Sequence, residues 1–157
     1  MDNNKKRFKL CKFRFETETG EHVERFMITD RSLPMLEVNQ WLEAKGMRKI
    51  STGKEYGGKL VVYLNYLDSC GKEYDQATNK DVLNFINHLV YGDCMNLKIK
   101  SLEMQLSYST LRSYLTVITE MYKWLDSNYQ TNIVFSTKNN HQRASKSFLY
   151  GQIYSYD

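Results

Sequence analysis

Hydrophobic residues recur with a helical period in three successive segments of the chain. The segments run from Ser51 to Gly71, from Thr78 to Leu89 and from Ser107 to Leu125. In each segment the apolar positions are three or four residues apart, which places them on one face of an α-helix. Isolated helices of this length are marginal in water, so these apolar faces are expected to bury against each other or against a fourth helix.

A hydroxyl residue stands at the predicted start of each helix. Thr78 is followed three positions later by Asp81, which resembles a capping box with aspartate in place of the preferred glutamate. Ser51 and Ser107 occupy the corresponding positions of the other two helices. We therefore expect helices to begin at these three residues and the first helix to stop at Gly71.

The beginning of the chain is patterned as β-structure. Residues 8–15 alternate with a period of two, residues 23–28 are a second strand candidate, and Gly20 lies in the polar connection between them. This pattern predicts a β-hairpin. Pro34 is expected to introduce a short helix, with Gly46 just beyond its end. Two strands alone are rarely stable, so the hairpin is expected to lean on the helices or on a partner outside the chain.

These elements predict a mainly α protein, a helical bundle with a small N-terminal β-hairpin. A length of 157 residues fits one domain with a small attachment. We expect a hairpin extension in residues 1–32, a helical domain in 33–130 and a linker in 131–157. No apolar run has the length of a membrane span and no secretory signal opens the chain, so a soluble, cytoplasmic protein without membrane contact is expected.

The composition argues against an enzyme. The three cysteines form no C-x-x-C pair, and the three histidines show no metal-ligand spacing. Gly57 and Gly58 lack the flanking pattern of a P-loop or a dinucleotide fingerprint, and no G-x-S-x-G motif is present. We therefore predict no catalytic residue, no metal site and no cofactor.

Positive charge is mild in total, with a formal net charge of +4, but it is clustered. Basic residues gather in segments 5–14, 98–100 and 138–146 and near the starts of two predicted helices. Short hydroxyls beside lysine or arginine at a helix N-terminus suit phosphate oxygens, because free backbone N–H groups and the helix dipole add to the attraction. Serine and threonine are also the ordinary caps of helices, so capping is the alternative interpretation.

Three loose motifs follow one another in a specific order. The first helix carries Thr52, Gly53, Lys54, Glu55, Tyr56, Leu60, Tyr63, Leu64, Leu67 and Gly71. The second carries Thr78, Asp81, Val82, Phe85 and Leu89. The third carries Leu106, Ser107, Tyr108, Ser109, Thr110, Tyr114, Leu115, Ile118, Tyr122, Trp124 and Leu125. Over about half of the chain, this series resembles the core-binding, SAM-like domain of tyrosine recombinases, the phage-integrase family.

The resemblance implies an orthogonal four-helix bundle that forms one half of a clamp on double-stranded DNA. A separate catalytic domain forms the other half in that family, and its Arg, Lys, His-x-x-Arg, His/Trp and Tyr residues are not found here. The chain itself is therefore not expected to be an enzyme. Its parent would be a recombinase that integrates a mobile element and assembles as a tetramer on DNA, with residues 131–157 leading toward the absent catalytic domain. The loop at 92–106 is longer than the family norm.

In the family, the first and third of these helices cross the major groove. The DNA-binding residues that this implies are Thr52, Lys54, Lys59, Ser107, Tyr108, Ser109, Thr110 and Arg112, with Lys98 and Lys100 of the loop as further phosphate contacts. Most of them are expected to contact phosphates, and Arg112 is the residue best suited to a base edge. The hairpin is interpreted either as the remnant of an additional DNA-binding module or as a structural extension.

Two other functions are compatible with the sequence. The first is a stand-alone helical module that binds protein, suggested by an aromatic tail with Tyr129, Phe148, Tyr150, Tyr154 and Tyr156. The second is a small transcription regulator, which is disfavoured because no compact helix-turn-helix with its short turn is present. Binding of duplex DNA separates the recombinase hypothesis from the protein-binding one.

Overall fold

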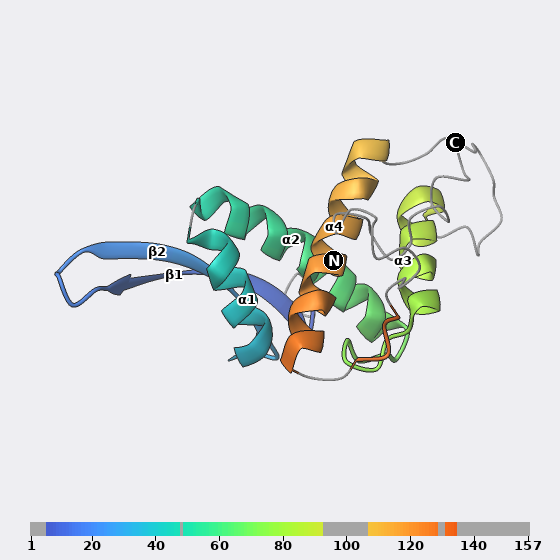
Figure 1. Ribbon diagram of the computed structural model, residues 1–157, viewed down its shortest axis with the longest axis horizontal. Helices are drawn as coiled ribbons and strands as arrows, with labels where there is room; N and C mark the ends of the chain where they lie inside the picture. Colours follow the sequence, from blue (N-terminus) through green and yellow to red (C-terminus); the bar gives the residue numbers. More distant parts are fainter. Residues whose placement is uncertain (1–5, 48, 93–106, 129–130, 135–157) are drawn as a thin grey trace. The chain divides into compact units, whose positions relative to one another are not determined.

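A computed structural model describes residues 6–47, 49–92, 107–128 and 131–134 of the chain. The elements follow one another in the order β1–β2–β3–α1–α2–α3–α4 (Figure 1). The chain divides into two compact units, Met1–Gly71 and Lys72–Asp157, and each unit is described by itself.

A three-stranded antiparallel sheet opens the first unit. β1 spans Phe8–Glu16 and β2 spans His22–Asp30, and the two strands pair over their whole length. The short strand β3, Leu33–Pro34, pairs with the last two residues of β2. The strand order is β1–β2–β3, so the predicted hairpin is confirmed and gains a third strand.

The two turns of the sheet differ in backbone chemistry. Between β1 and β2, the Thr17 N–H donates to the Glu21 carbonyl at 2.8 Å, and Gly20 takes a φ of 83°. Between β2 and β3, the two central residues Arg31 and Ser32 have φ angles of 48° and 70°. Such turns normally contain Asn-Gly or Asp-Gly, because other residues are strained at positive φ. The pair Arg-Ser carries no such signal, so β3 could not be expected from the pattern.

Two helices pack against this sheet. α1 spans Leu36–Gly46 and α2 spans Ile50–Ser69. Both helices contact β2, and α2 also contacts β1. The helices come very close where two glycines meet, since a Cβ built on Gly53 would stand 3.3 Å from the Cα of Gly46. The buried apolar side chains of the sheet, of α1 and of the residue between them are Phe8, Ile28, Met35, Val38, Trp41 and Leu42.

Two asparagines tie the outer edges of the hairpin to the helices. The Ile28 N–H donates to Asn39 Oδ1 at 2.7 Å, and Asn39 Nδ2 donates to the Ile28 carbonyl at 2.9 Å. Asn65 makes the same two bonds with the backbone of Phe8, both at 3.0 Å. Ile28 lies in β2 and Phe8 in β1, so at these points each edge receives a side-chain amide in place of a neighbouring strand.

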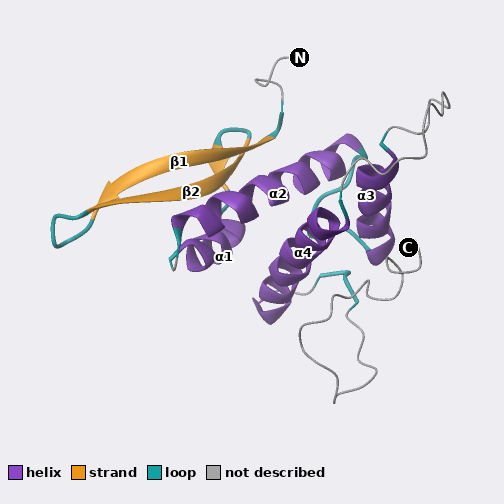
Figure 2. Ribbon diagram, turned by 90° about the horizontal axis from the view of Figure 1, so that it is seen from above, coloured by secondary structure: helices purple, strands orange, loops and turns teal. Residues whose placement is uncertain are grey.

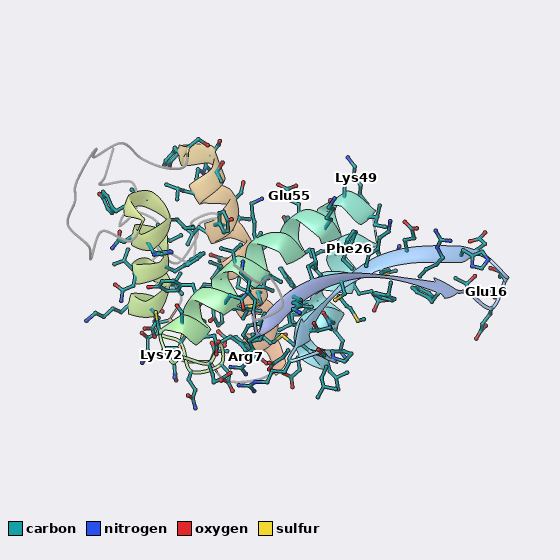
Figure 3. All side chains as sticks on the ribbon, turned by 180° about the vertical axis from the view of Figure 1, so that it is seen from behind. Arg7, Glu16, Phe26, Lys49, Glu55 and Lys72 are labelled. Atoms are coloured by element: carbon teal, nitrogen blue, oxygen red, sulfur yellow. The ribbon has the colours of Figure 1, made fainter. Side chains whose placement is uncertain are left out.

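The far half of the hairpin extends beyond both helices. Figure 2 shows β1 and β2 continuing past α1 and α2 to their turn. In Figure 3 the ribbon leaves the helices near Phe26 and reaches the turn beside Glu16, while Arg7 lies at the opposite end of β1. Lys12 and Arg14 lie on this projecting part and are exposed.

The second unit contains two further helices, α3 (Asn79–Tyr91) and α4 (Tyr108–Asn128). The Asp81 N–H donates to Thr78 Oγ1 at 3.4 Å, and the Thr78 N–H donates to the Asp81 carboxylate at 2.9 Å. These reciprocal bonds form the predicted capping box, which is therefore confirmed.

Contacts between the helices and a following segment organise this unit. The rings of Phe85 in α3 and Tyr114 in α4 meet edge to face, with 5.9 Å between their centroids. Burial raises the pKa of the Tyr114 phenol above its ordinary value. The Asn79 side chain binds the backbone of Val134 in both directions, with each bond at 2.8 Å. Residues 131–134 are thereby held against the start of α3.

The fold class predicted from the sequence is wrong. The described residues form four helices and a three-stranded antiparallel sheet, a small α+β fold rather than a mainly α, orthogonal four-helix bundle with a hairpin attached. The sheet contributes buried residues, Phe8 and Ile28, to the core. The helical period located the helices correctly, but an apolar stripe does not reveal whether it faces a helix or a sheet.

Three predicted helix ends also need correction. Pro34 lies in β3, and α1 begins two residues later. Gly46 is the last residue of α1 rather than the residue beyond it. Ser51 lies inside α2, whose N-cap is Lys49 without a side-chain capping bond. None of the helices described here is long and apolar enough to cross a lipid bilayer.

Candidate nucleic-acid interface

The hydroxyl residues predicted to contact DNA from the third helix lie together at the start of α4. Ser107 immediately precedes the helix, and its Oγ accepts the Thr110 N–H at 3.3 Å. The same oxygen lies 3.1 Å from Ser109 Oγ and 2.9 Å from Thr110 Oγ1. The three hydroxyl groups therefore form one hydrogen-bonded cluster. An anion at this place would meet hydroxyl donors and the positive end of the helix dipole together.

Arg112 supplies positive charge next to this hydroxyl cluster. Its side chain is exposed and follows Tyr108 by one helical turn. The guanidinium carbon lies 5.8 Å from the centroid of the Tyr108 ring, within the range of a cation–π contact. The Tyr108 hydroxyl oxygen is buried, so the ring is the part of this residue that faces Arg112. The spacing of four residues between Tyr108 and Arg112 is a sequence signal for such a contact on one helix face, although this contact was not predicted.

The second predicted group lies in the first turns of α2. Lys54 is exposed and Thr52 is half-buried. Lys59 differs, because its side chain is only 17% exposed and its Nζ lies 3.2 Å from Glu55 Oε1. Figure 3 shows Glu55 on the first half of α2, beyond Lys49 at the start of the helix. The spacing of four residues between Glu55 and Lys59 could have revealed this ion pair, which leaves Lys54 as the lysine of the group best placed to meet a phosphate.

The structure arranges the predicted contact residues as two groups. The group at the start of α4 belongs to the second unit, and the group at the start of α2 belongs to the first. Lys98 and Lys100 lie outside the described residues. The start of α4 therefore carries the most complete local arrangement of hydroxyl and cationic side chains.

Part of the basic N-terminal segment is neutralised by acids from other elements. Arg7 forms a two-pronged bond to Asp30, with Nε to Oδ1 at 2.7 Å and Nη2 to Oδ2 at 3.0 Å. Arg7 Nη1 also donates to Asp68 Oδ1 at 3.2 Å. Asp30 ends β2 and Asp68 lies in the last turn of α2, so Arg7, which immediately precedes β1, joins β2 to α2.

On the projecting part of the hairpin, two exposed cations share one acid. Arg14 lies 2.7 Å and Lys12 lies 3.1 Å from the carboxylate of Glu24 on the neighbouring strand. The hydrogen bonds from Arg14 and then from Lys12 hold the pKa of Glu24 below its usual value. Lys12 and Arg14 form part of a basic cluster in the sequence. The pairing of β1 with β2 places Glu24 beside them, although Glu24 is ten or more residues away along the chain.

The described residues offer no metal centre around which a site could be built. Among them, no group of three or more His, Cys, Asp or Glu side chains is placed to hold a metal ion. The candidate site therefore consists of hydroxyl, cationic and aromatic side chains alone. No protein-family model, no curated protein and no solved structure matches the chain.

Proposed function

We propose that this chain binds double-stranded DNA through the start of α4, as the clamping part of a site-specific tyrosine recombinase. The observation that carries the DNA-binding proposal is the cluster of Ser107, Ser109 and Thr110 hydroxyls with Arg112 one turn farther along the same helix. The recombinase part of the proposal rests on the resemblance of residues 52–126 to the phage-integrase family.

The chemistry of the α4 start fits a phosphate backbone better than other large ligands. Hydroxyl groups and free N–H groups at a helix N-terminus donate to phosphate oxygens and orient a helix on the duplex. A helix lying in the major groove presents the side chains of its first turns to base edges. Lys54 in α2 is the second exposed cation of the predicted set. Because several other cations are held in internal ion pairs, we expect few phosphate contacts and modest affinity.

Titration of a labelled duplex of mixed sequence, followed by fluorescence anisotropy at several salt concentrations, tests the proposal. The binding constant should fall as the salt concentration rises from about 50 mM to about 200 mM, with a slope set by the number of phosphate contacts. Lys54→Ala should weaken binding and make the dependence of log K on log salt shallower by about one. Lys72→Ala is the matched control, because Lys72 is also exposed and lies outside both groups.

Two results would contradict the DNA-binding proposal. One is the absence of duplex binding by the unmodified protein at low salt. The other is an equal loss of binding in Lys54→Ala and Lys72→Ala, because a general effect of net charge would then explain the attraction.

Binding of a protein partner is the second candidate function. Leu33 in β3 and Leu36 at the start of α1 are 70% and 76% exposed. Contiguous exposed apolar patches mark interaction sites, and these two leucines stand three residues apart in the chain. This function would be favoured if the protein failed to bind duplex DNA while Leu33→Ser and Leu36→Ser abolished binding to a partner protein.

A further inference from the structure

β1 is an edge strand of the sheet, and its open side is covered only near the start of the strand. The strand order β1–β2–β3 leaves one side of β1 without a neighbouring strand. On this side Asn65 bonds to the N–H and C=O of Phe8. Because main-chain groups alternate in direction along an antiparallel strand, those of Lys12, Arg14 and Glu16 face the same way as those of Phe8. Among the described residues, none bonds to these groups on the open side, so residues 12–16 form an open edge.

The open edge is exposed, and its positive charge is partly offset within the chain. It lies on the part of the hairpin that continues past α1 and α2 (Figures 2 and 3). Charged side chains on an edge normally prevent it from pairing with a strand of another molecule. Lys12 and Arg14 both lie beside the carboxylate of Glu24, at 3.1 Å and 2.7 Å. The repulsion between two copies of this edge is therefore reduced.

The order of charges along the open edge is complementary to that of a second copy. When two β1 strands pair antiparallel about a two-fold axis at Arg14, Lys12 of each copy lies opposite Glu16 of the other. Opposite charges at such positions stabilise neighbouring strands. The two Arg14 side chains meet at the axis, and each retains Glu24 of its own chain as a counter-ion.

The same pairing joins aromatic side chains on the other face of the hairpin. Leu10 approaches Gly57 of α2, so the alternation of side chains places Phe13 and Phe15 on the face directed away from this helix. Their rings stack with 5.8 Å between the centroids, and Phe15 is 37% exposed. With the axis at Arg14, Phe13 of each copy lies opposite Phe15 of the other. The two stacks then form one aromatic row, a favourable cross-strand arrangement.

We propose that two copies of this chain associate through the open edge of β1, forming one antiparallel sheet across a two-fold axis at Arg14. The outward N–H and C=O groups of residues 12, 14 and 16 then bond to the neighbouring β1 strand. The paired surface is small, so the dimer should be weak and depend on protein concentration. The association needs no nucleic acid, which distinguishes it from the assembly on DNA that the family resemblance implies.

Sedimentation velocity without DNA, at protein concentrations up to about 200 µM, tests the proposal. The unmodified protein should form a dimer as its concentration rises. Arg14→Pro removes the outward N–H at the axis but no bond to β2, since proline is tolerated where this group faces away from the sheet. It should raise the dissociation constant about tenfold or more. Arg14→Ala, which retains the N–H, is the matched control and should still dimerise.

Reversal of charge tests the register of the two strands. Glu16→Lys places like charges opposite each other twice and should raise the dissociation constant about tenfold. Adding Lys12→Glu to this variant restores opposite charges and should recover much of the lost affinity. Glu43→Lys, at an exposed position of α1, changes the net charge equally and should have little effect.

Hydrogen exchange on the unmodified protein tests the open edge without a substitution. The amides of Lys12, Arg14 and Glu16 should exchange more slowly at high than at low protein concentration, whereas the amide of Phe13, which faces β2, should be protected at both. A monomer at every concentration, or a dimer that Arg14→Pro leaves intact, would overturn the proposal. A dimer weakened equally by Glu16→Lys and Glu43→Lys would overturn the register. Circular dichroism verifies that each variant is folded.

Discussion

Gly57 and Gly58 are neighbours in α2 but have opposite surroundings. A Cβ on Gly57 would stand 2.6 Å from Leu10 Cδ1 and 3.2 Å from Leu42 Cδ2, whereas a Cβ on Gly58 would meet nothing within 4 Å. Glycine inside a helix lowers stability relative to alanine. Alanine is therefore the more stable choice unless a neighbouring group leaves no space for its Cβ. Gly57 is therefore required by the packing of the sheet on α2, and Gly58 is not.

Alanine at the two positions should change stability in opposite directions. Gly58→Ala should raise the free energy of unfolding by up to about 1 kcal/mol, through helix propensity. Gly57→Ala should lower it by about 1 kcal/mol or more, because Leu10 and Leu42 must move. Urea denaturation of both variants measures the difference. Equal stabilisation by both substitutions would show that Leu10 does not press on α2.

The β2–β3 turn offers a test of backbone strain at single residues. Ser32 has a φ of 70°, which costs a non-glycine residue about 1–2 kcal/mol. Ser32→Gly should therefore raise the free energy of unfolding by about 1 kcal/mol. Gly20→Ala is the opposite control, because Gly20 already has a φ of 83° and should lose stability on substitution. Thermal unfolding compares the two, and destabilisation by Ser32→Gly would contradict the strained turn.

At the scale of elements, the sheet depends on two side-chain amides. Asn65 occupies the hydrogen-bonding groups of Phe8 on the β1 edge, as Asn39 does for Ile28 on the β2 edge. An amide is the side chain that best imitates a neighbouring strand, since it offers one acceptor and a donor side by side. Neither asparagine could be singled out from the sequence, because the strand that each one meets is distant along the chain.

Removing one amide should leave the edge of β1 unsatisfied. Asn65→Leu should lower the free energy of unfolding by about 1–3 kcal/mol, and Asn65→Asp, which keeps only the acceptor, should have an intermediate effect at most. Chemical denaturation measures both. Asn84→Ala on the exposed surface of α3 is the control and should stay within about 0.5 kcal/mol of the unmodified protein. An Asn65→Leu variant as stable as this control would contradict the edge contact.

The bond between Arg7 and Asp30 links the two ends of the hairpin and should depend on pH. Hydrogen bonding from Arg7 holds the pKa of Asp30 below its usual value. Stabilisation by such a carboxyl is complete above its unfolded-state pKa of about 3.9 and is lost as the pH falls through the folded-state pKa.

Asp30→Asn should therefore lower the free energy of unfolding by about 1–2 kcal/mol at neutral pH. The difference from the unmodified protein should shrink as the pH is lowered below about 4. Denaturation at a series of pH values measures it, and Asp75→Asn, at an exposed position, serves as the control. A difference that stays constant down to low pH would show that the carboxylate is not the stabilising group.

Local patterns predicted the elements much better than their packing. The 3.6-residue period located α2, α3 and α4, and the Thr78–Asp81 spacing predicted the capping box of α3. The assignment to a mainly α class failed because the period of a stripe carries no information on the surface that covers it. β3 was not predicted because the turn before it consists of Arg31 and Ser32. Both residues have a positive φ, but turns of this kind are normally recognised in a sequence by Asn-Gly or Asp-Gly.

At the scale of the whole molecule, charge shows what sequence reasoning can and cannot provide. The sequence has a net charge of +4, and the basic segment 5–14 looks available to DNA. The fold pairs Arg7, Lys12 and Arg14 with acids from β2 and α2, so this segment offers less open positive charge than its composition suggests. Strand register and helix packing place Glu24, Asp30 and Asp68 beside these cations, and neither can be deduced from the order of residues along the chain.

The residues of the candidate site were predicted from the sequence, but their arrangement as one site was not. The hydroxyl cluster at Ser107, Ser109 and Thr110 was expected from residue types at a helix start, and the structure brings these groups together. The joint action of this cluster with Lys54 of α2 stays a prediction, as does the division of the chain at residues 32 and 130. The boundary between the two compact units falls in the chain between Gly71 and Lys72, and each predicted group lies within one unit.

The most direct test of DNA binding by the start of α4 is the affinity for a duplex after an acidic charge is placed there. Ser109→Glu lies in the first helical turn, where an acid favours the helix, so lost binding cannot be attributed to a weakened α4. Ser127→Glu introduces the same charge about 27 Å away along the same helix. We predict at least tenfold weaker binding for Ser109→Glu and a change within about twofold for Ser127→Glu. Equal affinities of the two variants would contradict the claim that this surface meets DNA.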